Sequence, residues 1–266
     1  MHTIQATAST MIAASLFDLK RIVRYNDGQG SITNEKITMT ETKRREFMRN
    51  ATLTMAGAGL LATAASSVSA QAVPPKVSRI IAVSGSHRVG KTCAAGLKLV
   101  LEAAKEADPR LETELVELAA IDFNQAVVGA DQPDDALTPL LNKIASPETV
   151  AIVVASPVYF GLPSGRCVSF FSRLMPLKRA GVFKNKVFGA LASGGARNGG
   201  QETVLHALIN SALTLQVILA VDGVPTSHWG GTLWNQGDSI EQDEFGKNTA
   251  KNLGVRIAEL TALVGK

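Results

Sequence analysis

Cysteine is scarce in this chain of 266 residues, which contains Cys93, Cys167 and no others. The two do not form a Cys-x-x-Cys pair. Because structural zinc sites and iron–sulfur centres need a compact cluster of ligands, neither is expected. Cys93 falls at a predicted helix start and Cys167 follows a loop, so two separate buried thiols are expected rather than a disulfide.

Clustered charge is also missing once the first 70 residues are set aside. Eight of the 27 Lys and Arg residues and five of the 23 Asp and Glu residues lie there, which leaves 19 basic and 18 acidic residues. A nucleic-acid surface requires cations gathered on one face, so nucleic acid is not an expected partner. Residues 71–266 contain no internal repeat, and their length suits one α/β domain with a sizeable core.

Residues 1–70 have the organisation of an export leader. Lys43-Arg44-Arg45-Glu46-Phe47 resembles the twin-arginine signal, 51–68 is uncharged, and Val68-Ser69-Ala70 offers the small residues that a signal peptidase reads. We expect cleavage after Ala70 and a periplasmic or secreted product, with a cytoplasmic precursor. An uncleaved anchor is the alternative, but the small and hydroxylated side chains of 51–68 make a weak one, so no stable membrane anchor is expected.

The segment before the twin arginines has no sustained periodicity, and 26–31 (NDGQGS) is loop chemistry. Because Met39 would begin a leader of ordinary length, we expect that translation starts there or that residues 1–38 are disordered. The predicted organisation is thus a leader over 1–70 and one domain over 71–266.

Beyond the leader, apolar runs alternate with helical patterns. Strands are predicted at 80–83, 112–118, 150–155, 187–192 and 215–221, the second as an edge-like strand because its apolar residues alternate. Helices are predicted at 97–107, 133–145, 165–174, 201–212 and 243–263. Five strands with intervening helices predict an α/β fold with a doubly wound parallel sheet in three α/β/α layers, whose ligand sits beyond the strands' carboxyl ends.

The segment Gly85–Thr92 (GSHRVGKT) joins the first predicted strand to the first helix, where free N–H groups and the helix dipole make an anion site. It fits G-x-x-x-x-G-K-[ST], the phosphate loop of nucleoside-triphosphatases, for which Asp222 after the fifth strand could bind magnesium. It also resembles G-S-x-R-x-x-(N/K)-T, an FMN-phosphate loop in which Ser86, Arg88 and Thr92 bind one monoester phosphate without a metal. At this loop alone, both ligands stay open.

Two further loops follow the third and fourth predicted strands. One, 156–165, is aromatic with two prolines, and the other, 193–202, is rich in glycine. A triphosphatase has no need of them. A planar, redox-active tricyclic ring does, because it needs a close backbone approach, an aromatic face and N–H donors.

On these three loops, the chain from about Ser78 to Leu263 resembles the NADPH-dependent FMN reductase family of flavodoxin-like flavoproteins. The resemblance implies a five-stranded flavodoxin-like sheet with FMN as the cofactor. It implies that the phosphate is bound by Ser86, Arg88, Lys91 and Thr92. It also implies a flavin wrapped by Pro157, Val158, Tyr159, Phe160 and Gly161, and approached at its other edge by Ser193, Gly194, Gly195 and Gly199. The family's iron–sulfur branch carries cysteines after the second strand, where this chain has 121–124 (IDFN), so no cluster is expected.

The resemblance implies an FMN-dependent oxidoreductase that passes hydride or electrons to a quinone or flavin and forms a homodimer or homotetramer. The family's usual donor is NAD(P)H, a cytoplasmic metabolite, whereas the leader points across the membrane. No acid–base residue and no metal site are expected, since the flavin carries the chemistry. A flavodoxin-like electron carrier and a phosphate-loop nucleotidase are the alternatives.

Several singled-out residues also have a simpler explanation. Tyr159 and Phe160 could plug the end of the sheet, and Arg197 is better explained as a solvated loop cation. Asp222, with Gly223 next, is expected to begin a turn rather than to bind magnesium. The roles of four further residues stay open: His87, His228, Trp229 and Trp234.

Overall fold

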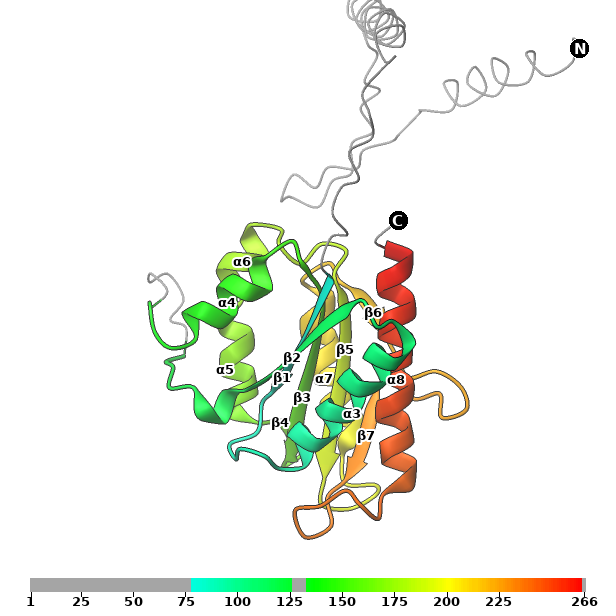
Figure 1. The fold of residues 1–266 in the computed structure, drawn as a ribbon. Coiled ribbons are helices and arrows are strands. Elements are labelled where there is room, and N and C mark those ends of the chain that lie inside the picture. The colour runs from blue at the N-terminus through cyan, green and yellow to red at the C-terminus, as the bar shows by residue number, and fades with distance from the viewer. Residues whose placement is uncertain (1–77, 126–132, 265–266) are drawn as a thin grey trace, which may run out of the picture. The chain divides into compact units, whose positions relative to one another are not determined.

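The computed structural model describes residues 78–125 and 133–264, and it contains the predicted alternation of strands and helices (Figure 1). The strands are β1 Ser78–Ser84, β2 Leu111–Glu117, β3 Thr149–Tyr159, β4 Leu162–Pro163, β5 Val187–Gly194, β6 Ile218–Ala220 and β7 Gly231–Trp234. The helices are α3 Thr92–Ala107, the short 3-10 helix η1 Leu118–Ala120, α4 Thr138–Ala145, α5 Gly165–Arg173, α6 Met175–Arg179, α7 Gln201–Leu213 and α8 Glu244–Val264.

The sheet has the order β2-β1-β3-β5-β6, and every neighbouring pair along this path is parallel. The edge position of β2 is as predicted. β7 is also parallel to β5, and β4 pairs with the end of β3 in an antiparallel hairpin. The doubly wound, flavodoxin-like fold predicted from the sequence is therefore confirmed.

The fifth strand differs from its prediction. Residues 215–221 were expected to form one strand, but only Ile218–Ala220 does, because α7 ends in a turn with Gln216 in the left-handed region (φ 64°). The chain then leaves the sheet after Ala220 and returns as β7, which pairs with β5 just beyond β6. The fifth position of the sheet is thus shared by two short strands, β6 and β7.

The predicted helix over 133–145 is also shorter, since α4 begins at Thr138. Its expected first turn is a tight turn in which the Asp135 carboxylate accepts the Leu137 N–H at 3.0 Å. The Asp135 N–H in turn donates to the Thr138 hydroxyl at 3.1 Å. A carboxylate that binds its own backbone competes with helix formation, which explains the later start.

Side chains of the central strands alternate between two buried layers. Ile80 and Ala82 of β1 pack with α3 and α8, whereas Ile81 and Val83 pack with α4, α5 and α7. Helices α3 and α8 cover one face side by side (Figure 1). Gly254 of α8 permits this approach, because a Cβ there would lie 2.2 Å from the Val100 carbonyl oxygen. Both faces are therefore covered, and the polar loops at the strands' carboxyl ends remain accessible.

Candidate functional site

The three loops singled out in the sequence meet at the carboxyl ends of adjacent strands β1, β3 and β5. The Gly85 N–H donates to the Ala155 carbonyl at 2.7 Å, and the Ser164 hydroxyl donates to the Gly85 carbonyl. The Ser193 hydroxyl donates to the Thr92 hydroxyl at 2.9 Å. The second and third loops are thus each hydrogen-bonded to the first, so the three loops are joined on one rim of the sheet.

The first loop offers a set of free donors. Within the residues that the structure describes, the N–H groups of Ser86, His87, Val89 and Lys91 have no hydrogen-bond acceptor. The Ser86 side chain is buried, and its oxygen accepts the Arg88 N–H at 3.0 Å. Lys91 is the N-cap of α3 and gives the helix no side-chain cap. Free N–H groups at a helix start fit a monoester phosphate, with the hydroxyls of Ser86 and Thr92 beside them.

The two cations of this loop share one partner, Asp238. Arg88 Nη1 and Nη2 lie 2.8 and 2.7 Å from its two oxygens, and Lys91 Nζ lies 3.3 Å away. The hydrogen bond from Arg88, and next that from Lys91, lowers the pKa of the Asp238 carboxyl. Sequence reasoning missed Asp238. The available signal was Asn235-Gln236-Gly237-Asp238, a turn sequence that follows the last strand on the same rim.

The aromatic loop is a hairpin, because β3 continues four residues past its predicted end at Ala155. Phe160 and Gly161 form its tip with positive φ angles of 53° and 75°. The Tyr159 ring stacks near His87 with 6.0 Å between centroids, and Phe160 is fully exposed. Neither ring plugs the end of the sheet, so that simpler explanation is wrong. Pro157 and Val158 lie half-buried within β3 itself.

The glycine loop is constrained from within. A Cβ on Gly194 would meet the Gln201 side-chain amide at 2.6 Å, and one on Gly199 would meet the Ala196 carbonyl oxygen at 2.8 Å. These two glycines are required by packing inside the loop. Gly195 differs, since a Cβ there would find nothing within 4 Å. Gly195 is therefore the point at which a planar ligand can approach this backbone closely.

Gln201, which the sequence placed in the glycine-rich loop without a role, holds that loop in shape. Its side-chain nitrogen donates to the carbonyls of Ala196 and Leu233 at 2.6 and 3.1 Å, and its oxygen accepts the Gly199 N–H at 2.8 Å. In the sequence, Gln201 belongs to the segment 199–202 that resembles the family and starts the predicted helix 201–212. One buried amide thus ties the loop to β7.

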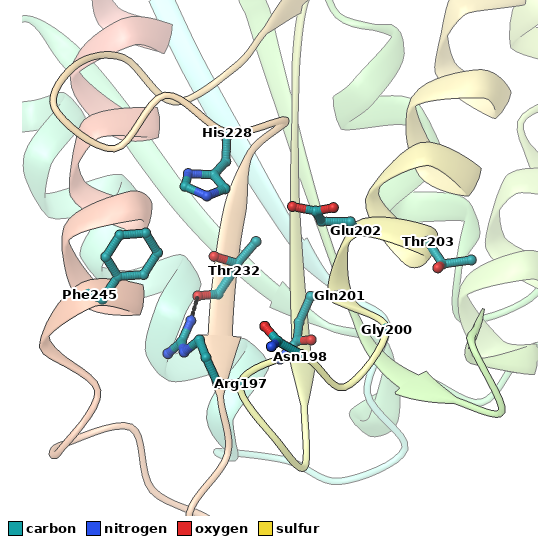
Figure 2. A pocket seen from close by; sticks show the side chains of 9 residues that line it. All are labelled: Arg197, Asn198, Gly200, Gln201, Glu202, Thr203, His228, Thr232 and Phe245. Atoms are coloured by element: carbon teal, nitrogen blue, oxygen red, sulfur yellow. Dashed lines mark hydrogen bonds between the residues drawn. The ribbon is translucent and has the colours of Figure 1, made fainter.

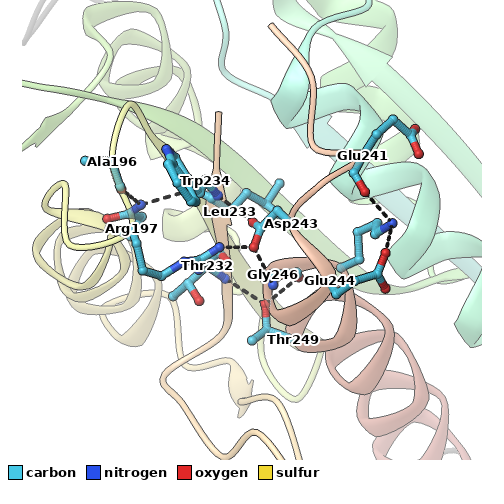
Figure 3. Close-up of polar contacts among 12 residues, drawn as sticks. Ala196, Arg197, Thr232, Leu233, Trp234, Glu241, Asp243, Glu244, Gly246 and Thr249 are labelled. Atoms are coloured by element: carbon cyan, nitrogen blue, oxygen red, sulfur yellow. Dashed lines mark hydrogen bonds and ion pairs between the residues drawn. The ribbon is translucent and has the colours of Figure 1, made fainter. Parts of the chain in front are cut away.

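Arg197 is not the solvated loop cation that the sequence suggested. It forms an ion pair with Asp243, which is buried, and donates to the Thr232 carbonyl at 3.1 Å (Figure 3). Asp243 also accepts the Trp234 N–H at 2.6 Å, and the Trp234 indole donates to the Gly195 carbonyl at 3.3 Å. This network caps the free edge of β7 and places Trp234 against the glycine loop.

His228 and Trp229 lie on the segment between β6 and β7. His228 lines a cavity of about 330 Å³ together with Arg197, Glu202 and Phe245 (Figure 2). Asp222 is buried and its Oδ1 accepts the His228 N–H at 2.6 Å. Asp222 thus belongs to a turn, as predicted.

The two cysteines are separate buried thiols, as predicted. Burial raises the pKa of both, that of Cys167 to about 12. Cys167 also leaves no room for a side chain at position 85, because a Cβ on Gly85 would lie 2.7 Å from the Cys167 Cβ. In the described ranges, no group of three or more His, Cys, Asp or Glu side chains could hold a metal ion.

Together, the doubly wound sheet and the joined loops define a flavodoxin-like fold whose first loop, after β1, presents free N–H groups that fit an anion. Residues 78–229 match the family model of the NADPH-dependent FMN reductases. The chain belongs to this family and is an FMN-dependent oxidoreductase. This assignment replaces the nucleotidase alternative that the first loop had left open.

Individual relatives agree with the assignment. An iron–sulfur flavoprotein of Methanocaldococcus jannaschii is 32% identical over 194 residues, which is 71% of this chain and 100% of the relative. An NAD(P)H dehydrogenase (quinone) of Paraburkholderia phymatum is 31% identical over 99 residues, 37% of this chain and 48% of the relative. The crystal structure of RosB with bound 8-demethyl-8-formylriboflavin-5'-phosphate has the same fold. The structural match covers 71% of this chain and 81% of RosB, with a TM-score of 0.55 and 16% sequence identity.

Proposed function

We propose that this protein is an exported FMN reductase or quinone reductase whose FMN is held across the three joined loops. The observation that carries the proposal is the set of direct hydrogen bonds between Gly85–Thr92 and the other two loops. When bound there, FMN would accept a hydride or electrons and pass them on. The free N–H groups of the first loop would hold the phosphate, while Tyr159 and Gly195 would lie on either side of the ring.

The acceptor that we propose is a quinone or a flavin, in line with the family and with the quinone-reducing relative. NAD(P)H is the family's donor, but it is a cytoplasmic metabolite. An exported enzyme would meet a membrane quinol or a periplasmic redox protein instead. Rapid turnover of the exported protein with NADPH, together with no turnover with those donors, would reverse this choice.

The cofactor prediction is tested by releasing the ligand. Heating purified protein should release one FMN per chain, identified by its absorption spectrum and its mass. Wild-type protein unfolded in urea gives the chain concentration for the ratio. Release of ATP, or of FAD alone, would contradict the proposed site.

The export prediction concerns Arg44 and Arg45, which lie outside the described residues. Changing both to lysine should leave folded, yellow precursor in the cytoplasm, because the twin-arginine route reads the arginine pair and transports folded protein with its cofactor. Wild-type exported protein should begin at or near Gln71 and retain FMN, as checked by cell fractionation and N-terminal sequencing.

A matched control for this experiment changes Arg110 and Arg256 to lysine, two substitutions of the same kind at exposed positions of the domain, outside the signal. Export should then continue. Periplasmic protein despite the lysine pair at 44 and 45 would argue against the twin-arginine route. A full-length, membrane-bound form would favour the uncleaved anchor over 51–68, which lies outside the described residues. Among the helices that the structure describes, none is long and apolar enough to cross a membrane.

A further inference from the structure

A fourth loop reaches the rim from the segment between β7 and α8. Gln236 and Ser239 exchange backbone hydrogen bonds of 2.9 and 3.1 Å around a two-residue tip, Gly237-Asp238, with φ angles of 60° and 67°. The Asp238 N–H also donates to the Asn235 side chain at 2.8 Å. Two positive φ angles are typical of a tight hairpin turn. The turn is therefore a defined structure that presents one carboxylate to the phosphate loop.

This carboxylate lies where the two cations of the loop converge. Its Oδ2 is 2.8 Å from Arg88 Nη1 and 3.3 Å from Lys91 Nζ, and its Oδ1 is 2.7 Å from Arg88 Nη2. Such a two-point contact with a guanidinium is also the contact that a phosphate monoester makes. Asp238 thus uses the positive charge that the FMN phosphate would use.

A second carboxylate contacts the loop, because Glu117, the last residue of β2, accepts the Gly90 N–H at 2.7 Å. A phosphate with nearly two negative charges would therefore meet two carboxylates around two cations if Asp238 kept its place. Asp238 is the more easily displaced of the two, since it stands on an exposed turn and its side chain is 36% exposed.

We propose that Asp238 is a built-in competitor of the FMN phosphate, whose carboxylate must leave Arg88 and Lys91 when FMN binds. The proposal rests on the proposed phosphate site. It makes Asp238 a specificity-determining residue, because the competition lowers affinity for FMN without affecting riboflavin, which has no phosphate. The chain's preference for the phosphorylated flavin is then set by this turn as well as by the loop.

The test measures the Kd of FMN and of riboflavin on flavin-free protein by quenching of flavin fluorescence. Asp238→Asn should tighten FMN binding about two- to fivefold, the upper part of the range for release of an exposed ion pair, and should leave riboflavin binding unchanged. Glu259→Gln is the matched control. It removes the same charge from another exposed ion pair, Arg256–Glu259 (2.8 Å) on α8, and should change neither Kd.

Each other outcome overturns the proposal. Weaker FMN binding in Asp238→Asn would show that the carboxylate orients Arg88 for the phosphate, and an equal change for riboflavin would show an effect unrelated to the phosphate. In an Arg88→Ala background the gain should shrink, because one of the two shared cations is gone; an unchanged gain would contradict the mechanism. Wild-type protein that binds neither flavin would overturn the proposed function itself, a result distinct from normal FMN binding with no effect of Asp238→Asn.

Discussion

Replacing Asp135 by alanine is expected to lower the free energy of unfolding by about 3–5 kcal/mol, the cost of leaving a buried charge without its partner. The Arg173 side chain is fully buried, and its Nη1 and Nη2 lie 2.6 and 3.0 Å from the two Asp135 oxygens. The carbonyls of Asn124 and Pro133 would remain as acceptors at 3.0 and 2.8 Å, but they carry no full charge. Denaturant unfolding of the purified protein measures the loss.

The neighbouring Asp134 provides the control for this measurement. It is exposed and, within the described ranges, makes no hydrogen bond or ion pair. Asp134→Ala should therefore change stability by less than about 0.5 kcal/mol. Equal losses of unfolding free energy for the two substitutions would mean that the Arg173–Asp135 ion pair does not stabilise the fold.

The same pair predicts a pH dependence. The hydrogen bond from Arg173 lowers the pKa of Asp135 in the folded protein. A carboxyl whose pKa is lowered by folding stabilises the fold above its unfolded pKa of about 3.9, and this stabilisation is lost as the pH falls through the folded pKa. The stability difference between wild type and Asp135→Ala should therefore be constant near neutral pH and shrink below about pH 4. A difference that grows on acidification would contradict the assignment.

The sequence was most informative where one physical cause dominates. The apolar runs at 80–83, 150–155 and 187–192 are buried on both faces, the pattern expected of a central parallel strand. Once these strands were recognised, the parallel order placed their following loops on one rim. The meeting of Gly85–Thr92 with the other two loops was therefore predictable without knowledge of a single side-chain contact.

The remaining features depend on contacts between distant segments. The division of the fifth strand into β6 and β7 left no periodic signal, because strands of three and four residues are too short to show one. Asp238 lies 150 positions from Arg88, and only the folded chain shows where its turn reaches. The internal role of Gly194 likewise follows from the position of the Gln201 side chain.

Replacing Arg88 by alanine is expected to weaken FMN binding about 10- to 100-fold, the range for loss of a charge-assisted hydrogen bond, while riboflavin binding changes little. Arg88 and Lys91 are the two cations of the loop, and only the Arg88 guanidinium can make a two-point contact with the phosphate, so we expect it to be the strongest single contact. Fluorescence titration of flavin-free protein with both ligands gives the two Kd values. Adding magnesium should alter neither, because the loop is expected to bind one monoester phosphate through its own donors.

The comparison of the two ligands separates a phosphate contact from a structural role. Arg110→Ala is the control, since Arg110 is another exposed arginine paired with a carboxylate, Asp108, at 2.8 Å. It precedes β2 and so lies at the rim opposite the three loops. Equal losses for FMN and riboflavin in Arg88→Ala would show that Arg88 supports the loop rather than the phosphate. A loss confined to FMN, absent in Arg110→Ala, would place the phosphate at Gly85–Thr92 and thereby orient the flavin toward Tyr159 and Gly195.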